Sequence, residues 1–304
     1  MAQSRIGFRM MHEQPPLPAP NRKSLIVQLV MNVECWEFDK PLPRKLLSTP
    51  YNQDPVPDIP NYCWVEYGLR IGMSRFIEMC AARNLPAMIN LNSAIIAEYP
   101  RLAAAMREMN WEIVGHGVHH RMLFMEKDEN AVINRCLDQI ERFFGSRPRG
   151  WLGPGLAETF KTLDYLKLAG IDYVFDWVLD DYPDWIETKH GRLVSLPYGG
   201  LDLNDVTVWM SDKLGASEYF ERIRNTVTTF ESEMHQRPRF LTLALHPHVA
   251  CVPHRMPVLI KTIDWLLSRK DTIFMTGSRV ADWFVDQCNK GTQKSAAETA
   301  RNAI

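Results

Sequence analysis

Histidines follow two separate apolar runs of this chain, at points where buried strands would end. His116 and His120 follow the run Trp-Glu-Ile-Val-Gly, and His246 and His248 follow the run Leu-Thr-Leu-Ala-Leu. Histidine is the side chain best suited to metal binding and to proton transfer near neutral pH. Two such clusters suggest the rim of one shared active site. Each cluster alone also fits ordinary polar residues at the end of a strand.

Strand-like apolar runs alternate with helical patterns along most of the chain. The strand-like runs cover residues 25–32, 86–91, 111–115, 173–177, 193–196, 206–210, 240–245 and 272–275, with a further short segment after Arg149. The helical patterns cover residues 68–83, 98–109, 130–144, 158–169, 216–234, 256–268 and 278–287. This alternation predicts one α/β domain with a parallel sheet that closes into a barrel.

Three segments lie outside this alternating pattern. Residues 1–23 contain Pro-Pro-Leu-Pro-Ala-Pro and predict an extended arm that frays or lies on a neighbouring subunit. Residues 24–288 would form the single domain, and the polar residues 289–304 would form a tail. Residues 40–62 hold six prolines and no periodicity, so we expect a functional loop or a subunit contact there.

The composition is that of a soluble globular protein, with 304 residues, 46% of them apolar and 23% charged. The net charge of −1 and the lack of a long basic stretch argue against nucleic acid or an anionic membrane as a partner. No apolar run reaches the ~18 residues of a membrane span. The N-terminus lacks the apolar core of a secretory signal, and the six cysteines form no Cys-x-x-Cys pair. We therefore expect a cytoplasmic protein that acts on a small molecule.

Catalytic groups of such a barrel come from the C-terminal ends of several strands, and this sequence has carboxylates, imidazoles or tryptophans at five of the expected ends. Beyond the histidines, these residues are Glu34, Cys35, Trp36, Trp151, Pro154, Gly155, Asp180, Asp181, Asp184 and Trp185. The tryptophans could instead be core packing, and the aspartates could be a solvated turn or helix cap.

The order of these motifs resembles the polysaccharide deacetylase family, which shares the NodB homology fold. The matching motifs are Glu34-Cys35, His116…His120, Trp151…Pro154-Gly155, Asp181…Asp184-Trp185 and Leu243…His246. The resemblance covers residues 25–285, and its details are most similar to the branch of metal-independent allantoinases and cyclic imide hydrolases. It implies a distorted (β/α) barrel with about seven parallel strands and, from that branch, a homo-oligomer.

The resemblance also implies roles in the hydrolysis of an amide, which needs activated water, a stabilised oxyanion and a protonated nitrogen. Glu34 would activate the water, directly or as a metal ligand. His246 would protonate the leaving nitrogen, with Asp181 orienting it. The residues expected to bind the substrate are Trp36, Trp151, Pro154, Trp185 and His248.

The metal stays open at this point. Family deacetylases usually carry two aspartates in the first motif, where this chain has Glu34 and Cys35. In the allantoinase-like branch the second histidine of the His-x-x-x-His motif is commonly replaced and the metal is lost. One divalent ion, zinc, bound by His116 and His120 with Glu34, is one alternative. In the other there is no cofactor, and His120 lines the pocket or faces solvent. Cys35 could bind zinc or be a small buried residue.

Three functions therefore compete. The first is a hydrolase of non-peptide carbon–nitrogen bonds in a small cyclic amide, imide or ureide, as in allantoinases. The second is a deacetylase of N-acetylated sugars or oligosaccharides, which would need an open groove. The third is an inactive relative that binds a ligand, suggested by Cys35. Residues 40–62 would close the pocket, which favours the small substrate.

Overall fold

The computed structural model describes residues 5–14, 16–48, 51 and 53–301. Nine strands form one sheet in the order β6-β7-β5-β4-β3-β2-β1-β8, and β9 pairs with the first residues of β1. The strands are β1 Leu25–Val33, β2 Met88–Leu91, β3 Glu112–Gly115, β4 Gly150–Trp151, β5 Tyr173–Val174, β6 Asp184–Thr188, β7 Gly191–Ser195, β8 Arg239–Leu245 and β9 Thr272–Phe274.

All strand pairs are parallel except β6 with β7, so the predicted α/β fold with a parallel sheet is confirmed. Eight strands run parallel, against the predicted number of about seven. The pairs found in the described residues include none between β8 and either β6 or β7. Closure into a barrel therefore stays a prediction.

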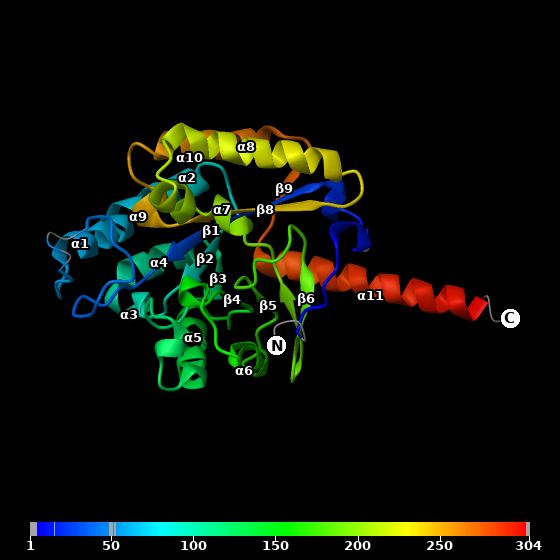
Figure 1. The fold of residues 1–304 in the computed structure, drawn as a ribbon, viewed down its shortest axis with the longest axis horizontal. Helices are drawn as coiled ribbons and strands as arrows, with labels where there is room; N and C mark the ends of the chain where they lie inside the picture. The colour runs from blue at the N-terminus through cyan, green and yellow to red at the C-terminus, as the bar shows by residue number, and fades with distance from the viewer. Residues whose placement is uncertain (1–4, 15, 49–50, 52, 302–304) are drawn as a thin grey trace.

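Helices pack around this sheet, with α8 and α10 together on one side and α5 and α6 on the other (Figure 1). The helices are α1 Ile59–Tyr67, α2 Met73–Ala81, α3 Ile95–Glu98, α4 Pro100–Glu108, α5 Glu129–Phe144, α6 Thr162–Leu168, α7 Gly200–Leu203, α8 Ala216–Glu233, α9 Pro247–Ala250, α10 Met256–Ser268 and α11 Gly277–Arg301. Among the described residues, no helix has both the length and the apolar character that crossing a bilayer requires.

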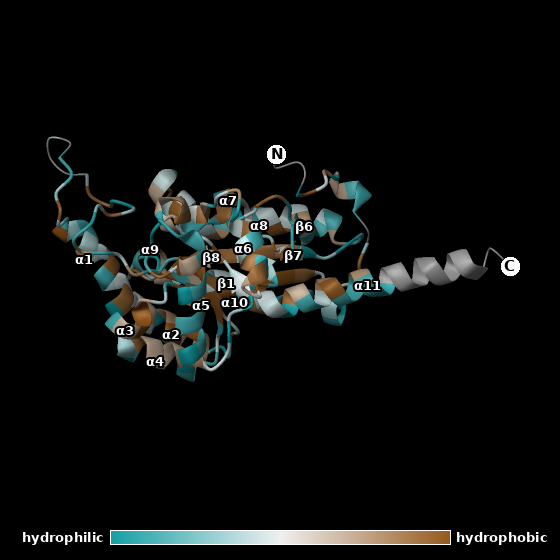
Figure 2. Ribbon diagram, turned by 90° about the horizontal axis from the view of Figure 1, so that it is seen from below, coloured by the Kyte–Doolittle hydropathy of each residue, from teal (hydrophilic) through white to brown (hydrophobic). Residues whose placement is uncertain are grey.

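The central strand β1 is buried at all nine positions, because β2, β8 and β9 cover its edges and helices cover its faces. Figure 2 shows apolar residues along the central strands and polar residues on the outer faces of helices. Val33 pairs with Leu91, Leu91 with Gly115, and Met31 with Leu245. This register brings the C-terminal ends of β1, β2, β3 and β8 to one edge, where the residues that follow them meet.

Helix α5 shows how the sequence supports that edge. Its N-cap is Asp128, whose carboxylate accepts a hydrogen bond of 2.9 Å from the backbone N–H of Ala131. Its C-terminus is followed by Gly145 in the left-handed conformation, with φ of 86°. The apolar residues that it buries, spaced as one helix face, are Ile133, Cys136, Leu137 and Ile140. Helix α5 packs on β3 and so fixes the strand that leads to the first histidines.

Two predicted elements differ from the structure. Residues 206–210 are not a strand; they lie in a π-helical turn, Thr207–Ser211, preceded by Val206 donating its backbone N–H to the side chain of Asn204. That turn still buries Val208 and Trp209, so the apolar pattern fits a helical turn as well as a strand. Helix α11 runs to Arg301 through most of the predicted polar tail, whose residues 302–304 lie outside the described part.

The N-terminal arm packs on its own chain rather than fraying, as far as it is described. Arg5 forms an ion pair of 2.9 Å with Asp164, and Trp283 donates a hydrogen bond of 3.1 Å to the carbonyl of Pro18. Leu17 is buried in the apolar cluster beside them. Residues 1–4 and 15 of the predicted arm lie outside the described residues. A contact with a neighbouring subunit stays a prediction.

Gly115, the last residue of β3, tests how closely this edge is packed. A Cβ atom at Gly115 would lie 2.7 Å from Cε3 of the buried Trp151 indole. Neither group can move away in a filled core, so Gly115→Ala should lower the free energy of unfolding by about 1–3 kcal/mol in urea denaturation. Gly7→Ala is the matched control, because its Cβ would meet no atom within 4 Å. Equal stability of the two variants would contradict this packing.

Candidate active site

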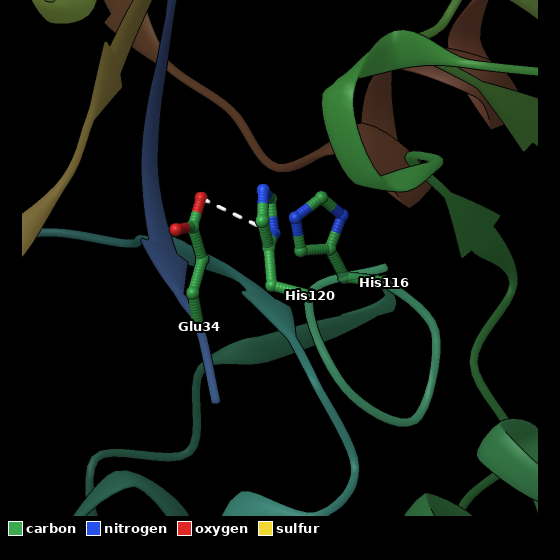
Figure 3. A group of neighbouring side chains, drawn as sticks. All are labelled: Glu34, His116 and His120. Carbon is green, nitrogen blue, oxygen red and sulfur yellow. Dashed lines mark ion pairs between the residues drawn. The ribbon is translucent and has the colours of Figure 1, made fainter. Parts of the chain in front are cut away.

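Glu34, the first residue after β1, lies beside the imidazole of His120, with His116 on the far side of that ring (Figure 3). Its Oε1 atom is 3.5 Å from Nδ1 of His120 and 3.2 Å from Nε2 of His246. Its Oε2 atom accepts a 2.7 Å hydrogen bond from the indole of Trp36. Burial opposes ionisation, but the two imidazoles and the guanidinium of Arg44 outweigh it and hold the pKa of Glu34 well below its usual value. Glu34 is therefore a buried carboxylate.

His116 and His120 present nitrogen atoms to this carboxylate from the segment after β3, as Figure 3 shows. Nδ1 of His116 lies 2.6 Å from the carbonyl of Leu152, which can only accept, so Nδ1 carries the proton and Nε2 has a free lone pair. Burial lowers the pKa of His116, and it lowers the pKa of His120 to about 3. Both rings are therefore neutral at pH 7.

The three side chains have the composition of a divalent metal site. One ligand atom from each of Glu34, His116 and His120 lies within 4.8 Å of the others. Within the described residues, Nε2 of His116 and Nδ1 of His120 are buried and make no hydrogen bond. Two imidazoles and a carboxylate suit zinc and leave a position for water, and a backbone carbonyl that orients a histidine is typical of such sites. The structure thus brings together the residues predicted as ligands, and they fit the ion.

His246, the residue after β8, is held by a carboxylate that the sequence did not reveal. Its Nδ1 lies 2.6 Å from Oδ1 of Asp205, and its backbone N–H donates a 2.6 Å hydrogen bond to Oδ2. Burial alone would lower the pKa of His246, but Asp205 and Glu34 outweigh it and raise that pKa to about 9. His246 is therefore an imidazolium between two buried carboxylates.

The prediction that Asp181 orients His246 is wrong. The exposed Asp181 has its carbonyl 3.3 Å from the backbone nitrogen of Phe240, near the start of β8, whereas His246 follows its end. Six residues of extended strand separate these points by about 20 Å. Asp205 lies in the segment that follows the C-terminal end of β7, at the same edge of the sheet, and this position was a signal in the sequence. Because residues 206–210 were predicted as a strand, Asp205 was expected before a strand rather than after one.

Most of the residues predicted to bind substrate pack elsewhere. Trp151 is fully buried in the core, under the strand ends, and Trp185 lies in β6 with its ring 5.3 Å from that of Phe284. Both tryptophans therefore pack in the core, which was the alternative interpretation of these residues. Pro154 is buried beside Gly117, which has the positive φ of a tight turn.

Trp36 and His248 lie next to the group around Glu34 instead of facing a substrate. The Trp36 indole hydrogen-bonds Glu34, and its ring centre is 5.6 Å from that of His248. The ring of His248 is edge-on to Trp64, and its Nε2 is buried without a hydrogen bond among the described residues. Trp36 therefore contacts the Glu34 carboxylate directly, and His248 packs against Trp36.

A cavity of about 210 Å³ opens directly on Glu34, His116, His120 and His246. It is smaller than most ligand pockets, which span about 300–1,000 Å³. Its other polar walls come from residues that sequence reasoning missed, namely Asn32, Arg44, Tyr198 and Asn204, and its apolar walls include Leu152, Leu156 and Leu201. Arg44 belongs to residues 40–62, so this segment does reach the pocket, although residues 49, 50 and 52 lie outside the described part.

Cys35 points away from this cavity. Its thiol donates a hydrogen bond to Glu98, with Sγ 3.3 Å from Oε2, and Nε2 of His119 lies 3.2 Å from the other oxygen of that carboxylate. Burial and the charge of Glu98 raise the pKa of the Cys35 thiol. Cys35 therefore does not join Glu34 as a ligand, and the expectation of a small buried residue describes it better.

A pair of carboxyl groups stiffens the cavity wall at Gly153. Asp176 accepts a 2.6 Å hydrogen bond from the backbone N–H of Gly153, and Glu158 accepts one of 3.0 Å from the indole of Trp177. The second oxygen of each carboxyl is buried without a hydrogen bond in the described structure. Burial raises the pKa of both groups; the charge of Glu129 adds to this effect at Glu158, whose pKa rises to about 7, and the charge of Glu158 adds to it at Asp176.

The pair predicts a pH dependence of stability. Between the pKa of a free glutamate, about 4.3, and the value of about 7 in the fold, the folded protein holds a proton that the unfolded chain has released. Stability should therefore fall as pH rises through this window, and Glu158→Gln should flatten the fall. Urea titrations at several pH values measure it, with the exposed Glu108→Gln as control. Identical slopes for Glu158→Gln and the parent protein would refute this.

Comparison with known proteins agrees with this architecture. The model of a family described as "Polysaccharide deacetylase" matches residues 65–174. A putative polysaccharide deacetylase of Schizosaccharomyces pombe is 24% identical, with 87% of this chain and 91% of the relative covered. Among solved structures, a probable polysaccharide deacetylase from Pseudomonas aeruginosa superposes with a TM-score of 0.79 at 22% identity, covering 89% of this chain and 94% of that one. The allantoinase PuuE superposes with a TM-score of 0.78, at the same identity and coverage.

These similarities are to proteins of the family that the sequence motifs resemble, and the TM-scores show a shared fold. The match runs through nearly the whole domain that carries Glu34, His116 and His246. Residues 65–174 match this family of hydrolases, which act on carbon–nitrogen bonds other than peptide bonds, and the resemblance expected from the sequence motifs is thereby confirmed.

Proposed function

We propose that this protein hydrolyses an amide bond in a small cyclic amide, imide or ureide. The observation that carries the proposal is the contact of one buried carboxylate, Glu34, with an imidazolium, His246, at the bottom of a cavity of about 210 Å³. A base and an acid beside one reacting centre are what amide hydrolysis needs, because water must lose a proton and the leaving nitrogen must gain one.

Glu34 is placed to accept the proton of the attacking water. Its Oε1 atom faces both His120 and His246, so a water molecule in the cavity would meet the carboxylate and the acid together. Trp36 binds the other oxygen, Oε2, and so fixes the orientation of the carboxylate. Holding the base in position removes much of the entropic cost of bringing reactants together.

His246 is placed to donate the proton to nitrogen. Asp205 accepts from its Nδ1, so the proton on Nε2 faces Glu34 and the cavity. After donation, the carboxylate of Asp205 keeps the ring in the tautomer that can be protonated again. This is the usual role of a carboxylate behind a catalytic histidine.

We propose further that Glu34, His116 and His120 hold one divalent ion, zinc. When bound, the ion would lower the pKa of a water ligand and polarise the carbonyl. Glu34 would then act as a ligand rather than as a free base, while His246 would keep the same role. The unpartnered nitrogens of His116 and His120 support this assignment.

Deacetylation of N-acetylated sugars is the second candidate, favoured by the family description of the matching model and of the fission yeast relative. The chemistry at Glu34 and His246 would be the same. The narrow cavity and the approach of residues 40–62 favour the smaller substrate. A binding protein without activity is the third candidate, and turnover of any compound would exclude it.

Substitution of the acid and the base tests the proposal. Glu34→Gln and His246→Ala should each lower kcat at least about 100-fold on a panel of cyclic amides, ureides and N-acetyl sugars, since each removes a proton transfer. Thermal melting checks that the variants fold. Asp181→Asn is the control and should keep the parent activity, because Asp181 lies at the far end of β8. Near-normal turnover by either site variant would overturn the assignment.

Metal analysis tests the ion separately. The purified protein should hold about one zinc per chain, and His116→Ala or His120→Ala should bind it at least about tenfold more weakly in a chelator competition. His119→Ala is the neighbouring control, because His119 contacts Glu98 outside the cavity. A metal-free protein with full activity in chelator would remove zinc from the proposal and leave the acid and base in place.

A further inference from the structure

Arg44 brings a cation into the cavity from residues 40–62, outside the strands of the sheet. Its charge acts on the buried site, because it lowers the pKa of Glu34, His120 and His248. Its Nη1 atom is buried and donates no hydrogen bond to any described residue. A guanidinium is always charged, and a buried donor without an acceptor is costly. The free protein therefore leaves this donor for a ligand or water.

The carboxylates near Arg44 already have other partners. Glu34 is bound by the indole of Trp36 and the imidazolium of His246, and among the described residues Asp205 pairs with His246. Neither carboxylate forms an ion pair with Arg44 in the described structure. The positive charge of Arg44 therefore faces the cavity without a matching anion, and a bound divalent ion would add to the positive potential.

The geometry points to an anionic substrate. We propose that Arg44 binds a carboxylate of the substrate, so that the protein acts on a small amide or ureide that carries a carboxylate. The assignment rests on the proposed function, since it places the reacting amide at Glu34 and His246. A guanidinium matches a carboxylate with two parallel hydrogen bonds and so fixes the ring relative to the acid and base. The volume of about 210 Å³ favours a single ring over a sugar chain.

Matched pairs of compounds test the assignment without relying on turnover. Dihydroorotate and dihydrouracil share one cyclic ureide and differ by the presence of a carboxylate, whereas N-acetylglycinamide carries a neutral amide in place of the carboxylate of N-acetylglycine. Binding of all four is measured by calorimetry to the Glu34→Gln protein, in which hydrolysis is blocked. The same titrations are repeated with Arg44→Met, Arg44→Lys and Lys45→Met added. Lys45 is the control, because it pairs with Asp54 in the same segment.

The expected result is a preference of about tenfold or more for the carboxylate member of at least one pair, as for a hydrogen-bonded ion pair. Arg44→Met should abolish the preference, Arg44→Lys should keep part of it, and Lys45→Met should leave it unchanged. Absence of a preference in both pairs, or a preference that survives Arg44→Met, would overturn the proposal. A preserved preference in a protein whose parent hydrolyses no compound would contradict the proposed function and leave the role of Arg44 standing.

Discussion

A carboxylate buried at the end of the central strand is the constraint on which the site depends. An ion removed from water must be compensated, and loss of one partner from such a group is strongly destabilising. The compensation for Glu34 comes from the Trp36 indole, the imidazolium of His246 and the charge of Arg44, with the ring of His120 beside them. These groups belong to four separate segments. Glu34 can therefore stay ionised in the core only because the strand register brings those segments together.

The parts of the structure that could be predicted are those set by local pattern. The sequence shows the long apolar runs of β1 and β8 and the amphipathic stripe of α5, because a buried strand or a buried helix face requires such a pattern. The parallel sheet follows from the alternation of these elements. Glu34, His116 and His120 could be grouped because residues that follow parallel strands share one edge. The homo-oligomer and the cytoplasmic location stay predictions.

The parts that could not be predicted depend on contacts between remote segments. Asp181 and Asp205 are the same residue type near two candidate strand ends, and only the chain direction at β8 separates the one that reaches His246. Tryptophan gives no better guide, because Trp36 supports the carboxylate while Trp151 fills the core with the same ring. Arg44 lies in a segment without periodicity, so no pattern in the sequence predicts that its side chain reaches the cavity.

Two pairs of neighbouring residues, Glu34–Cys35 and His119–His120, send their members to opposite sides of the backbone. A hydrogen bond of 2.9 Å from the N–H of His120 to the carbonyl of Cys35 holds the two segments in this alignment. A slip of one residue in both would present Cys35 and His119 to the cavity and exchange an oxygen donor for sulfur. Together with the hydrogen bond from the N–H of Cys35 to the side chain of Asn92, this backbone bond keeps Glu34 and His120, rather than Cys35 and His119, at the cavity.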